Sequence, residues 1–404
     1  MFKQALEGIT IADFGQTWAG PHLTRTLGDM GARIIKIESL RRMDVIRSLP
    51  PFPKEEDHTL NNSGYYNWLN RNKMAVTLDL TTDKGSALAK ELIKISDALV
   101  ENYSRGVMEK FGLDYESVKK VNPGIIYAAL TSMGMDGPYK DFAMYGRPQV
   151  YVSGLAEVTG YPDGPPLSVM SWGDPVAAHH GAFALLAALR HRKKTGLGQF
   201  IELSQWESLI CLSPETILEY SLNGRIMTRQ GNRHEVMAPH NSYQCREPLD
   251  YLNIAVSSDE EWKALCRVMG SPAWADEEKF ADPFSRWQNQ EELDRHIEEW
   301  TMESTSSELT KQLQEAGVAA FPSLSNRRVV EDPHLKARGY FEEWDHPEAG
   351  RRQYDGILWK MSKTPGKIRM RAPMVGEHNQ YVFGELLGMS GEEIDRLIEE
   401  KVIA

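Results

Sequence analysis

The chain has 404 residues, of which 41% are hydrophobic and 25% are charged. This length predicts two or three domains with a large core, and the ordinary composition excludes a collagen, a coiled coil and a wholly disordered chain. The formal net charge of -11 argues against a general nucleic-acid-binding protein, which needs a basic face. A polyanionic ligand would therefore have to meet a local basic cluster.

Membrane insertion, export and metal binding are not indicated either. No run of 18 or more apolar residues occurs, and the first residues lack the apolar core of a signal peptide. The three cysteines, Cys211, Cys245 and Cys266, are too few and too scattered for a disulfide framework or a zinc site. We therefore expect a cytoplasmic protein with no membrane partner, no nucleic-acid partner and no metal.

Short apolar strands alternate with helices in the first half of the chain. Strands are expected at residues 8–14, 33–38, 74–80, 97–102, 124–131 and 199–204, and helices at 23–32, 83–96, 115–122 and 175–190. Strand–helix–strand units of about 30 residues favour a parallel sheet with right-handed crossovers. The strands are nearly continuously apolar, which is typical of a sheet covered by helices on both faces. The helix at 175–190 is rich in small residues and is expected to be buried on all sides.

The pattern changes near residue 225. A strand at 251–256 is followed by charged helices at 259–269, 290–302 and 304–315. We therefore divide the chain into the N-terminal part of a large domain (1–224), a small α+β domain (225–330) and a C-terminal segment that returns to the large domain (331–404).

Three segments beside the predicted strands could bind a phosphate-containing ligand. The turn G-Q-T-W-A-G-P (15–21) opens a helix and could present backbone N–H groups to phosphate, but it is not G-x-G-x-x-G, so a nicotinamide or flavin is poorly supported. Residues 33–47 gather several cations where ligands bind in open parallel sheets: Arg33, Lys36, Arg41, Arg42 and Arg47. The polar segments 70–73 and 101–113 also flank strands. The alternative for each segment is an ordinary solvated loop.

Asp174 directly precedes Pro175 and the long small-residue helix. Asp at the N-cap followed by Pro is a common helix start, so capping is the simplest interpretation. The alternative is a nucleophilic carboxylate whose neighbouring N–H groups stabilise an oxyanion. His179 and His180 lack metal-ligand spacing and are expected to pack. The residues alone indicate an α/β enzyme. Whether it binds a phosphate-containing ligand stays an open question at this point.

Read together, several segments resemble the class III CoA-transferases, the family of formyl-CoA transferase and carnitine CoA-transferase. They follow one another over nearly the whole chain at 13–21, 31–38, 70–80, 98–113, 131–139, 172–189, 196–204, 331–341 and 372–378. The resemblance implies an α/β fold: a large Rossmann-like domain whose parallel sheet is built from N- and C-terminal segments, and a smaller α+β domain. It also implies an interlocked dimer, either a homodimer or a heterodimer with a paralogous subunit.

The resemblance places the family's catalytic aspartate on Asp174, which forms acyl-aspartyl and aspartyl-CoA intermediates in that family. It implies that no cofactor is permanently bound and that CoA is a substrate. The residues expected to border CoA or hold its phosphates are Gln16, Ala19, Lys36, Arg47, Asn70, Lys73, Asn102, Tyr103, Gly106 and Lys110. Two departures from the formyl-CoA branch are Lys110–Phe111, which replaces an Arg–Met pair, and residues 231–242, which replace a glycine-rich loop.

Two alternatives within the family are an α-methylacyl-CoA racemase and a catalytically inactive CoA-binding subunit. The racemases use a histidine as acid or base. Tyr145 occupies the place of that histidine here, so transfer is preferred.

The acyl partners are predicted from side chains expected near the site. These are the aromatic residues Trp18, Tyr66, Trp68, Tyr145, Tyr151 and Trp172 and the basic residues His22, Arg25, Arg147 and His240. An aromatic wall suits a bulky acyl group, and a second cation suits a second carboxylate. We therefore expect succinyl-CoA as donor and a substituted succinate, such as benzylsuccinate, as acceptor, with a pocket formed by Trp18, His22, Tyr145, Arg147 and His240. The alternative is that most of these aromatic side chains belong to the core.

Overall fold

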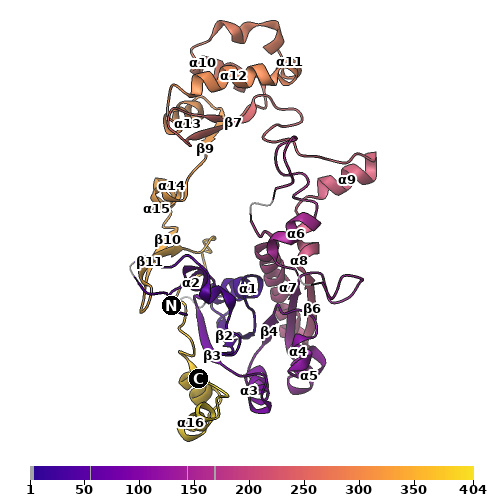
Figure 1. Ribbon diagram of the computed structural model, residues 1–404, viewed down its shortest axis with the longest axis vertical. Helices are drawn as coiled ribbons and strands as arrows, with labels where there is room; N and C mark the ends of the chain where they lie inside the picture. Colours follow the sequence, from indigo (N-terminus) through magenta and orange to yellow (C-terminus); the bar gives the residue numbers. More distant parts are fainter. Residues whose placement is uncertain (1–3, 55, 143, 168–169) are drawn as a thin grey trace. The chain divides into compact units, whose positions relative to one another are not determined.

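The computed structural model describes residues 4–54, 56–142, 144–167 and 170–404. The chain forms two compact units, which are described separately (Figure 1). The large unit comprises Met1–Ala156, Ser168–Arg225 and His334–Ala404. The small unit comprises Glu157–Leu167 and Ile226–Pro333, so it includes a segment from within the range 1–224.

Six parallel strands form the sheet of the large unit. They are β1 (Thr10–Asp13), β2 (Arg33–Glu38), β3 (Lys73–Thr77), β4 (Ala98–Glu101), β5 (Ile126–Thr131) and β6 (Gln199–Ser204), in the order β3-β2-β1-β4-β5-β6. Ile11 of β1 pairs with Ile34 on one side and with Ala98 on the other. The α/β class with a Rossmann-like parallel sheet is thereby confirmed. The strand order reverses between β1 and β4, and ligands bind at such a point at the carboxyl ends of the strands.

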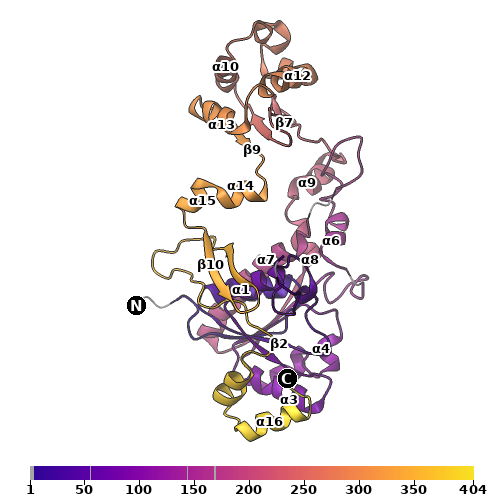
Figure 2. The same cartoon turned by 60° about the vertical axis from the view of Figure 1, so that its left-hand side comes forward.

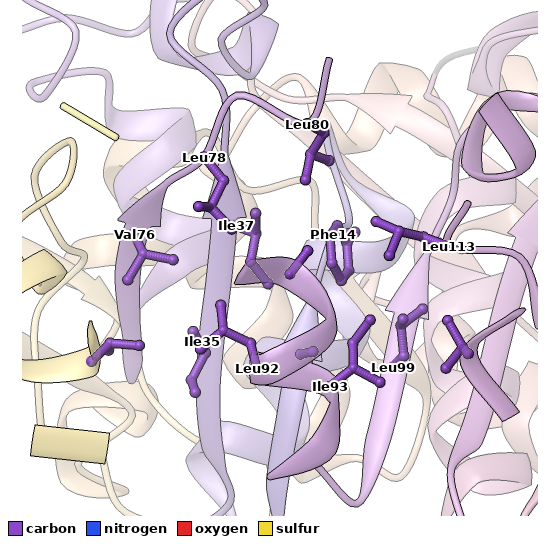
Figure 3. Packing of buried hydrophobic residues seen from close by; sticks show 14 of the residues in the cluster. Phe14, Ile35, Ile37, Val76, Leu78, Leu80, Leu92, Ile93, Leu99 and Leu113 are labelled. Atoms are coloured by element: carbon purple, nitrogen blue, oxygen red, sulfur yellow. The ribbon is translucent and has the colours of Figure 1, made fainter. Parts of the chain in front are cut away.

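Helices lie on both faces of this sheet, and each strand presents apolar residues to both, because successive strand residues point to opposite sides. The helices of this part of the chain are α1 (Ala19–Asp29), α2 (Gly64–Asn70), α3 (Asp83–Lys94), α4 (Val107–Lys110), α5 (Tyr115–Val121), α6 (Gly146–Val152), α7 (Gly173–Thr195), α8 (Gln205–Ile210) and α9 (Pro214–Asn223), with a 3-10 turn, η1, at Val45–Ser48. No residue of α9 is buried. Figure 3 shows Leu92 and Ile93 of α3 packed near Ile35 and Leu99. Ile34, beside Ile35 on β2, belongs to the core on the other face, with α1 and α7.

The helix α7 packs closely on α1 through small residues. A Cβ at Gly181 would lie 2.7 Å from Cδ1 of Leu23, so a larger residue would push the helices apart. The prediction that this helix is buried on all sides is wrong, because Phe183 is 76% exposed and Leu186 is 42% exposed. Its small residues bury one stripe against α1 and the sheet, and the remaining face is uncovered in this chain.

The C-terminal segment returns to the large unit through the hairpin β10 (Phe341–His346) and β11 (Gly350–Asp355), the π-helix η4 (Gln380–Leu386) and α16 (Gly391–Glu399). One detail of the expected fold needs correction: among the described residues, no C-terminal strand joins the six-stranded sheet. The outer edge of β3 instead bonds to residues 378–379 through backbone and side chains, and the backbone N–H of His378 donates to the Ala75 carbonyl at 3.0 Å. Thr77 N–H donates to Oδ1 of Asn379 at 3.0 Å, and Ala75 N–H meets Nδ1 of His378 at 3.3 Å.

The small unit is an α+β body around a three-stranded antiparallel sheet in the order β7-β8-β9. Its elements are β7 (His240–Gln244), β8 (Tyr251–Ala255), α10 (Asp259–Val268), η2 (Ala273–Asp276), η3 (Glu278–Phe280), α11 (Pro283–Gln288), α12 (Gln290–Thr301), α13 (Ser306–Glu315) and β9 (Ala319–Pro322), followed by α14 (Asn326–Glu331) and, at the boundary, α15 (Pro333–Ala337). Figure 2 shows α13 beside β9, where Leu313 and Ala320 share the apolar core. Thr305 and Glu308 form a capping box that fixes the start of α13.

Candidate active site

The loops that follow β1 and β4 are joined to each other where the strand order reverses. The backbone N–H of Gln16 donates to Oδ1 of Asn102 at 2.8 Å, and Nδ2 of Asn102 donates back to the Gln16 carbonyl at 2.9 Å. Thr17 has φ = 64°, which is uncommon for a β-branched residue. Its N–H donates to Oδ1 of Asp44 at 3.0 Å. Strain at this position is maintained by fixed partners, as at many functional sites.

Buried charges hold this β1–α1 loop from inside. The ammonium of Lys73 contacts Oδ2 of Asp13 and the Pro21 carbonyl, both at 2.9 Å. The ammonium of Lys36 contacts the Gly15 carbonyl at 2.8 Å and Oδ2 of Asp44 at 3.2 Å. Burial opposes ionisation of Asp13, but Lys73 and Lys36 outweigh it and hold the pKa of Asp13 below its usual value.

Arg47 and Asn70 are also interior residues. The guanidinium of Arg47 makes two hydrogen bonds to Glu38, at 2.9 and 2.7 Å, and is fully buried. Nδ2 of Asn70 donates to the Tyr66 carbonyl at 3.0 Å. The predicted ligands Lys36, Arg47, Asn70 and Lys73 are therefore buried in the large unit, each with at least one internal partner, whereas the buried Oδ1 of Asn70 has none among the described residues.

The other residues expected near CoA lie at the carboxyl ends of β1 and β4. Nε2 of Gln16 donates to the Tyr103 hydroxyl at 3.3 Å. Gly106 has φ = 82°, in the left-handed region that favours glycine, and precedes the first residue of α4. Lys110, at the end of α4, is exposed. The structure brings Gln16, Asn102 and Tyr103 together, with Gly106 following in the same loop.

Asp174 is the second residue of α7, and the N-cap is Trp172. The interpretation of Asp174 as the helix cap is therefore wrong, because the helix begins one residue before it. The carboxylate instead accepts a hydrogen bond from the backbone N–H of Ala19, the first residue of α1. It thus lies at the N-termini of two helices, where the helix dipoles favour negative charge.

No cation neutralises Asp174 among the described residues. Burial raises the pKa of Asp174 to about 6, and the Ala19 N–H only partly offsets this effect. A side chain at Gly146, the first residue of α6, would collide with the Asp174 carboxylate, so only glycine allows the α6 backbone to approach it this closely. The site therefore holds a half-buried carboxylate that packs against the start of α6.

Three aromatic residues form a wall beside Asp174, which we call the aromatic wall: Trp18, Tyr65 and Trp68. The ring of Trp18 meets Tyr65 edge-on at 5.7 Å and Trp68 at 5.8 Å between centroids. Burial, and next the charges of Asp174 and Asp44, raise the pKa of Tyr65, so its hydroxyl lies within electrostatic range of the Asp174 carboxylate. Sequence analysis chose Tyr66 instead, which is fully buried against Arg47. Consecutive helix residues point in different directions, so only one of these two tyrosines faces the site.

The basic residues expected in the pocket are not free cations there. Burial, followed by Arg25, lowers the pKa of His22 to about 2, so this imidazole is neutral. Its ring packs against His179 at 4.9 Å and Trp68 at 5.7 Å. Arg25 donates to the Trp68 carbonyl at 3.1 Å and to Asp355 at 3.2 Å, which uses its charge internally.

The other residues expected near the site make no ring contact with this wall among the described residues. Tyr145, Arg147, Tyr151 and Trp172 are exposed, and Tyr145 directly precedes Gly146, which packs against Asp174. His240 belongs to the small unit, where its Nδ1 lies 2.6 Å from the Asn232 carbonyl and the residue lines a cavity of about 530 Å³. No sequence pattern pointed to Tyr65 or Gly146, because their positions depend on contacts between distant segments.

Comparison with known proteins defines the class. The chain matches CoA-transferase family III over residues 6–379. It belongs to this family and is a CoA-transferase, which confirms the resemblance and the enzyme class. In the part of the chain that the structure describes, no helix is both long enough and apolar enough to cross a membrane, and no group of three or more acidic, histidine or cysteine side chains is placed to hold a metal ion.

Individual relatives refine this placement. The chain is 32% identical over 399 residues to a succinyl-CoA–D-citramalate CoA-transferase of Chloroflexus aurantiacus, covering 98% of each chain. It is 34% identical over 388 residues to a succinyl-CoA:mesaconate CoA-transferase of Haloarcula marismortui, covering 94% of this chain and 96% of the relative. The crystal structure of a CAIB/BAIF family protein from Brucella suis matches with a TM-score of 0.88 at 30% identity, over 95% of this chain and all of the other.

Proposed function

We propose that this CoA-transferase moves CoA from succinyl-CoA to a dicarboxylic acid, with Asp174 as the nucleophile. The observation that carries the proposal is the unpaired, half-buried carboxylate of Asp174 at the N-termini of α1 and α7. The relatives support the substrate class, since both use succinyl-CoA by name and both named acceptors, citramalate and mesaconate, are dicarboxylates.

The proposed reaction begins when a carboxylate oxygen of Asp174 attacks the thioester carbonyl of succinyl-CoA. The C–S bond breaks, CoA leaves as a thiolate, and a succinyl–aspartyl anhydride remains. The thiolate then attacks the aspartyl carbonyl carbon, which releases succinate and forms aspartyl-CoA. The acceptor carboxylate attacks this thioester and again expels the thiolate. Attack of the thiolate on the acceptor acyl carbon gives the new CoA ester and restores Asp174, with no net proton uptake.

The environment of Asp174 suits this chemistry. A carboxylate is a weak nucleophile in water, and partial removal from water makes it more reactive. A pKa of about 6 leaves most of the group ionised at neutral pH. The Ala19 N–H that now contacts the carboxylate can also donate to the oxyanion that forms when the aspartyl carbonyl is attacked.

CoA is proposed to bind at the joined loops after β1 and β4, next to Gln16, Asn102, Tyr103 and Gly106. The exposed Lys110 and Arg42 are the proposed phosphate contacts, because Lys36 and Arg47 are fully buried with internal partners. Lys36 and Lys73 then serve to hold the β1–α1 loop through the Gly15 and Pro21 carbonyls, whereas Arg47 and Asn70 hold the segment that contains Tyr66.

The substitution Asp174→Asn tests the nucleophile, because it keeps the shape of the side chain and an acceptor for the Ala19 N–H. We expect transfer to fall more than about 100-fold, which corresponds to roughly 2.7 kcal/mol. Intact-protein mass after incubation with succinyl-CoA should show a CoA-sized addition on the peptide with Asp174 in the wild type and none in the variant. Asp136→Asn, in an exposed loop after β5, is the control and should behave as the wild type. A variant that kept more than a hundredth of the rate would contradict covalent catalysis by Asp174.

We further propose that the acceptor carries a substituent, with benzylsuccinate as the bulky extreme. The aromatic wall supports this proposal, because aromatic faces pack well against apolar groups. A panel of acids with succinyl-CoA as donor tests it, and substituted succinates are expected to react fastest. Faster transfer to oxalate, formate or carnitine would contradict this substrate class while leaving CoA transfer intact. The racemase alternative needs a histidine as acid or base, and Tyr145, whose side chain is exposed, occupies the position of that histidine. Nothing observed at Tyr145 therefore favours a racemase.

A further inference from the structure

A cavity of about 520 Å³ lies in the large unit, between residues 51–68 and strand β11. Its walls are mainly apolar and include the aromatic rings of Phe52, Tyr65, Trp68 and Tyr354. Pockets of a few hundred cubic ångströms with apolar walls and few polar groups are typical of small-molecule sites.

The cavity shares a wall with the nucleophile. Tyr65 and Trp68 line it, and both belong to the aromatic wall. Trp18 directly precedes Ala19, whose N–H contacts Asp174, and the Trp18 ring lies 5.7 Å from the Tyr65 ring between centroids. The charge of Asp174 also raises the pKa of the Tyr65 phenol, in addition to the larger effect of burial. An acyl group attached at Asp174 could therefore extend past Tyr65 into this cavity.

The charged residues of the cavity, Asp355 and Arg352, differ in whether they have an ion-pair partner. The carboxylate of Asp355 is already shared between Arg25 at 3.2 Å and Arg71 at 3.3 Å. Arg352, on the same strand, is half-buried and donates from Nη1 to the Arg351 carbonyl at 3.0 Å. Across the residues that the structure describes, no carboxylate lies within ion-pair distance of Arg352. The cavity therefore has one cation without a counter-ion.

We propose that this cavity is the acyl subsite and that Arg352 binds the distal carboxylate of the dicarboxylic substrate. This inference rests on the proposed function. A guanidinium pairs with a carboxylate through two parallel hydrogen bonds, while the aromatic rings hold the carbon chain and any substituent. None of the cations chosen from the sequence has this combination, because Arg25 is paired and His22 is neutral.

The experiment compares two acceptors that differ only in the distal group: methylsuccinate and 2-methylbutanoate, in which a methyl group replaces the second carboxylate. In a double-displacement reaction, the kcat/KM of the acceptor reports only the half-reaction that starts from the CoA-loaded enzyme. With succinyl-CoA as donor, Arg352→Met should lower kcat/KM for methylsuccinate about 10-fold or more and change that for 2-methylbutanoate less than about 2-fold. Arg352→Lys should retain part of the preference.

Arg351→Met is the matched control. This neighbour is exposed and pairs with Glu343 at 2.8 Å, away from the cavity lining. It should leave both acceptors unchanged. An unchanged selectivity ratio in Arg352→Met, or an equal loss for both acceptors, would overturn the inference.

Formation of the aspartyl-CoA adduct distinguishes a failure of the proposed Arg352 role from a failure of the proposed function. If Arg352→Met still forms the adduct on Asp174, the variant is folded and its chemistry is intact, so selectivity alone decides the role of Arg352. If the wild type forms no adduct and transfers no CoA, the proposed function fails and this inference fails with it.

Discussion

Two aspartates next to α1, Asp13 and Asp174, have carboxyl groups whose pKa values are shifted in opposite directions. Asp13, at the end of β1, is fully buried, yet its pKa is lowered because Lys73 and Lys36 outweigh the cost of burial. Asp174 is less buried, yet its pKa is raised to about 6, because burial is opposed only by the Ala19 N–H. Depth of burial therefore does not separate Asp13 from Asp174, the proposed nucleophile. The two carboxylates differ in whether a cation is paired with them.

The largest expected effect comes from removing that cation. Lys73→Met leaves Asp13 buried beside an apolar side chain, and loss of one partner of a buried ion pair costs about 3–5 kcal/mol in the free energy of unfolding. Urea unfolding at pH 7 measures this loss. Adding Asp13→Asn should recover part of it, because the double variant no longer buries an uncompensated charge.

Lys84→Met is the control for this prediction, since Lys84 pairs with Glu400 at the surface and should cost less than about 1 kcal/mol. Equal losses for Lys73→Met and Lys84→Met, or no recovery in the double variant, would show that the Asp13 pair is not what stabilises this part of the fold.

A smaller effect of opposite sign is expected at the second aspartate. The folded-state pKa of Asp174 lies above the ordinary value of 3.8, so the folded chain binds more protons than the unfolded chain between about pH 4 and pH 6. Wild-type stability therefore falls as the pH rises through this window. Asp174→Asn removes the titration and should be more stable than the wild type by about 1–2 kcal/mol at pH 8, after allowance for partial exposure.

Thermal unfolding at pH 4 and pH 8 measures this difference in stability. The difference should nearly vanish at pH 4, because the wild-type carboxyl is then protonated in the folded chain and increasingly protonated in the unfolded chain. An Asn variant that is less stable at pH 8, or a difference that does not depend on pH, would show that Asp174 is not held at a cost to stability.

Much of the fold could be predicted because it depends on local patterns. The strands of the large unit are short apolar runs, and β2 and β5 begin and end close to the predicted ranges. The family resemblance pointed to Asp174. The C-terminal segment was assigned to the sheet, but the partners on the outer edge of β3 are the backbone and side chain of His378 and the side chain of Asn379, which no sequence periodicity indicates.

The site was harder to predict because strand-end position does not say what a side chain meets. Lys36 belongs to the basic cluster that includes a predicted strand end, and the family resemblance placed both Lys36 and Lys73 beside CoA. Their ammonium groups contact Asp44 and Asp13, and no sequence pattern connects these pairs. Arg352 was missed for the opposite reason: it lies far along the chain from Asp174, and only the fold brings strand β11 beside Tyr65.

The cover on the outer edge of β3 has a consequence for biosynthesis. All six strands are complete by Ser204, whereas the residues that satisfy the β3 edge, His378 and Asn379, come about 175 residues later. At roughly 5–20 residues per second, a ribosome needs about 9–35 s to supply them. During that interval the nascent sheet has an unpaired edge, which is a template for association with other chains. Refolding of the finished chain has all segments present at once and is expected to cover this edge sooner than synthesis does.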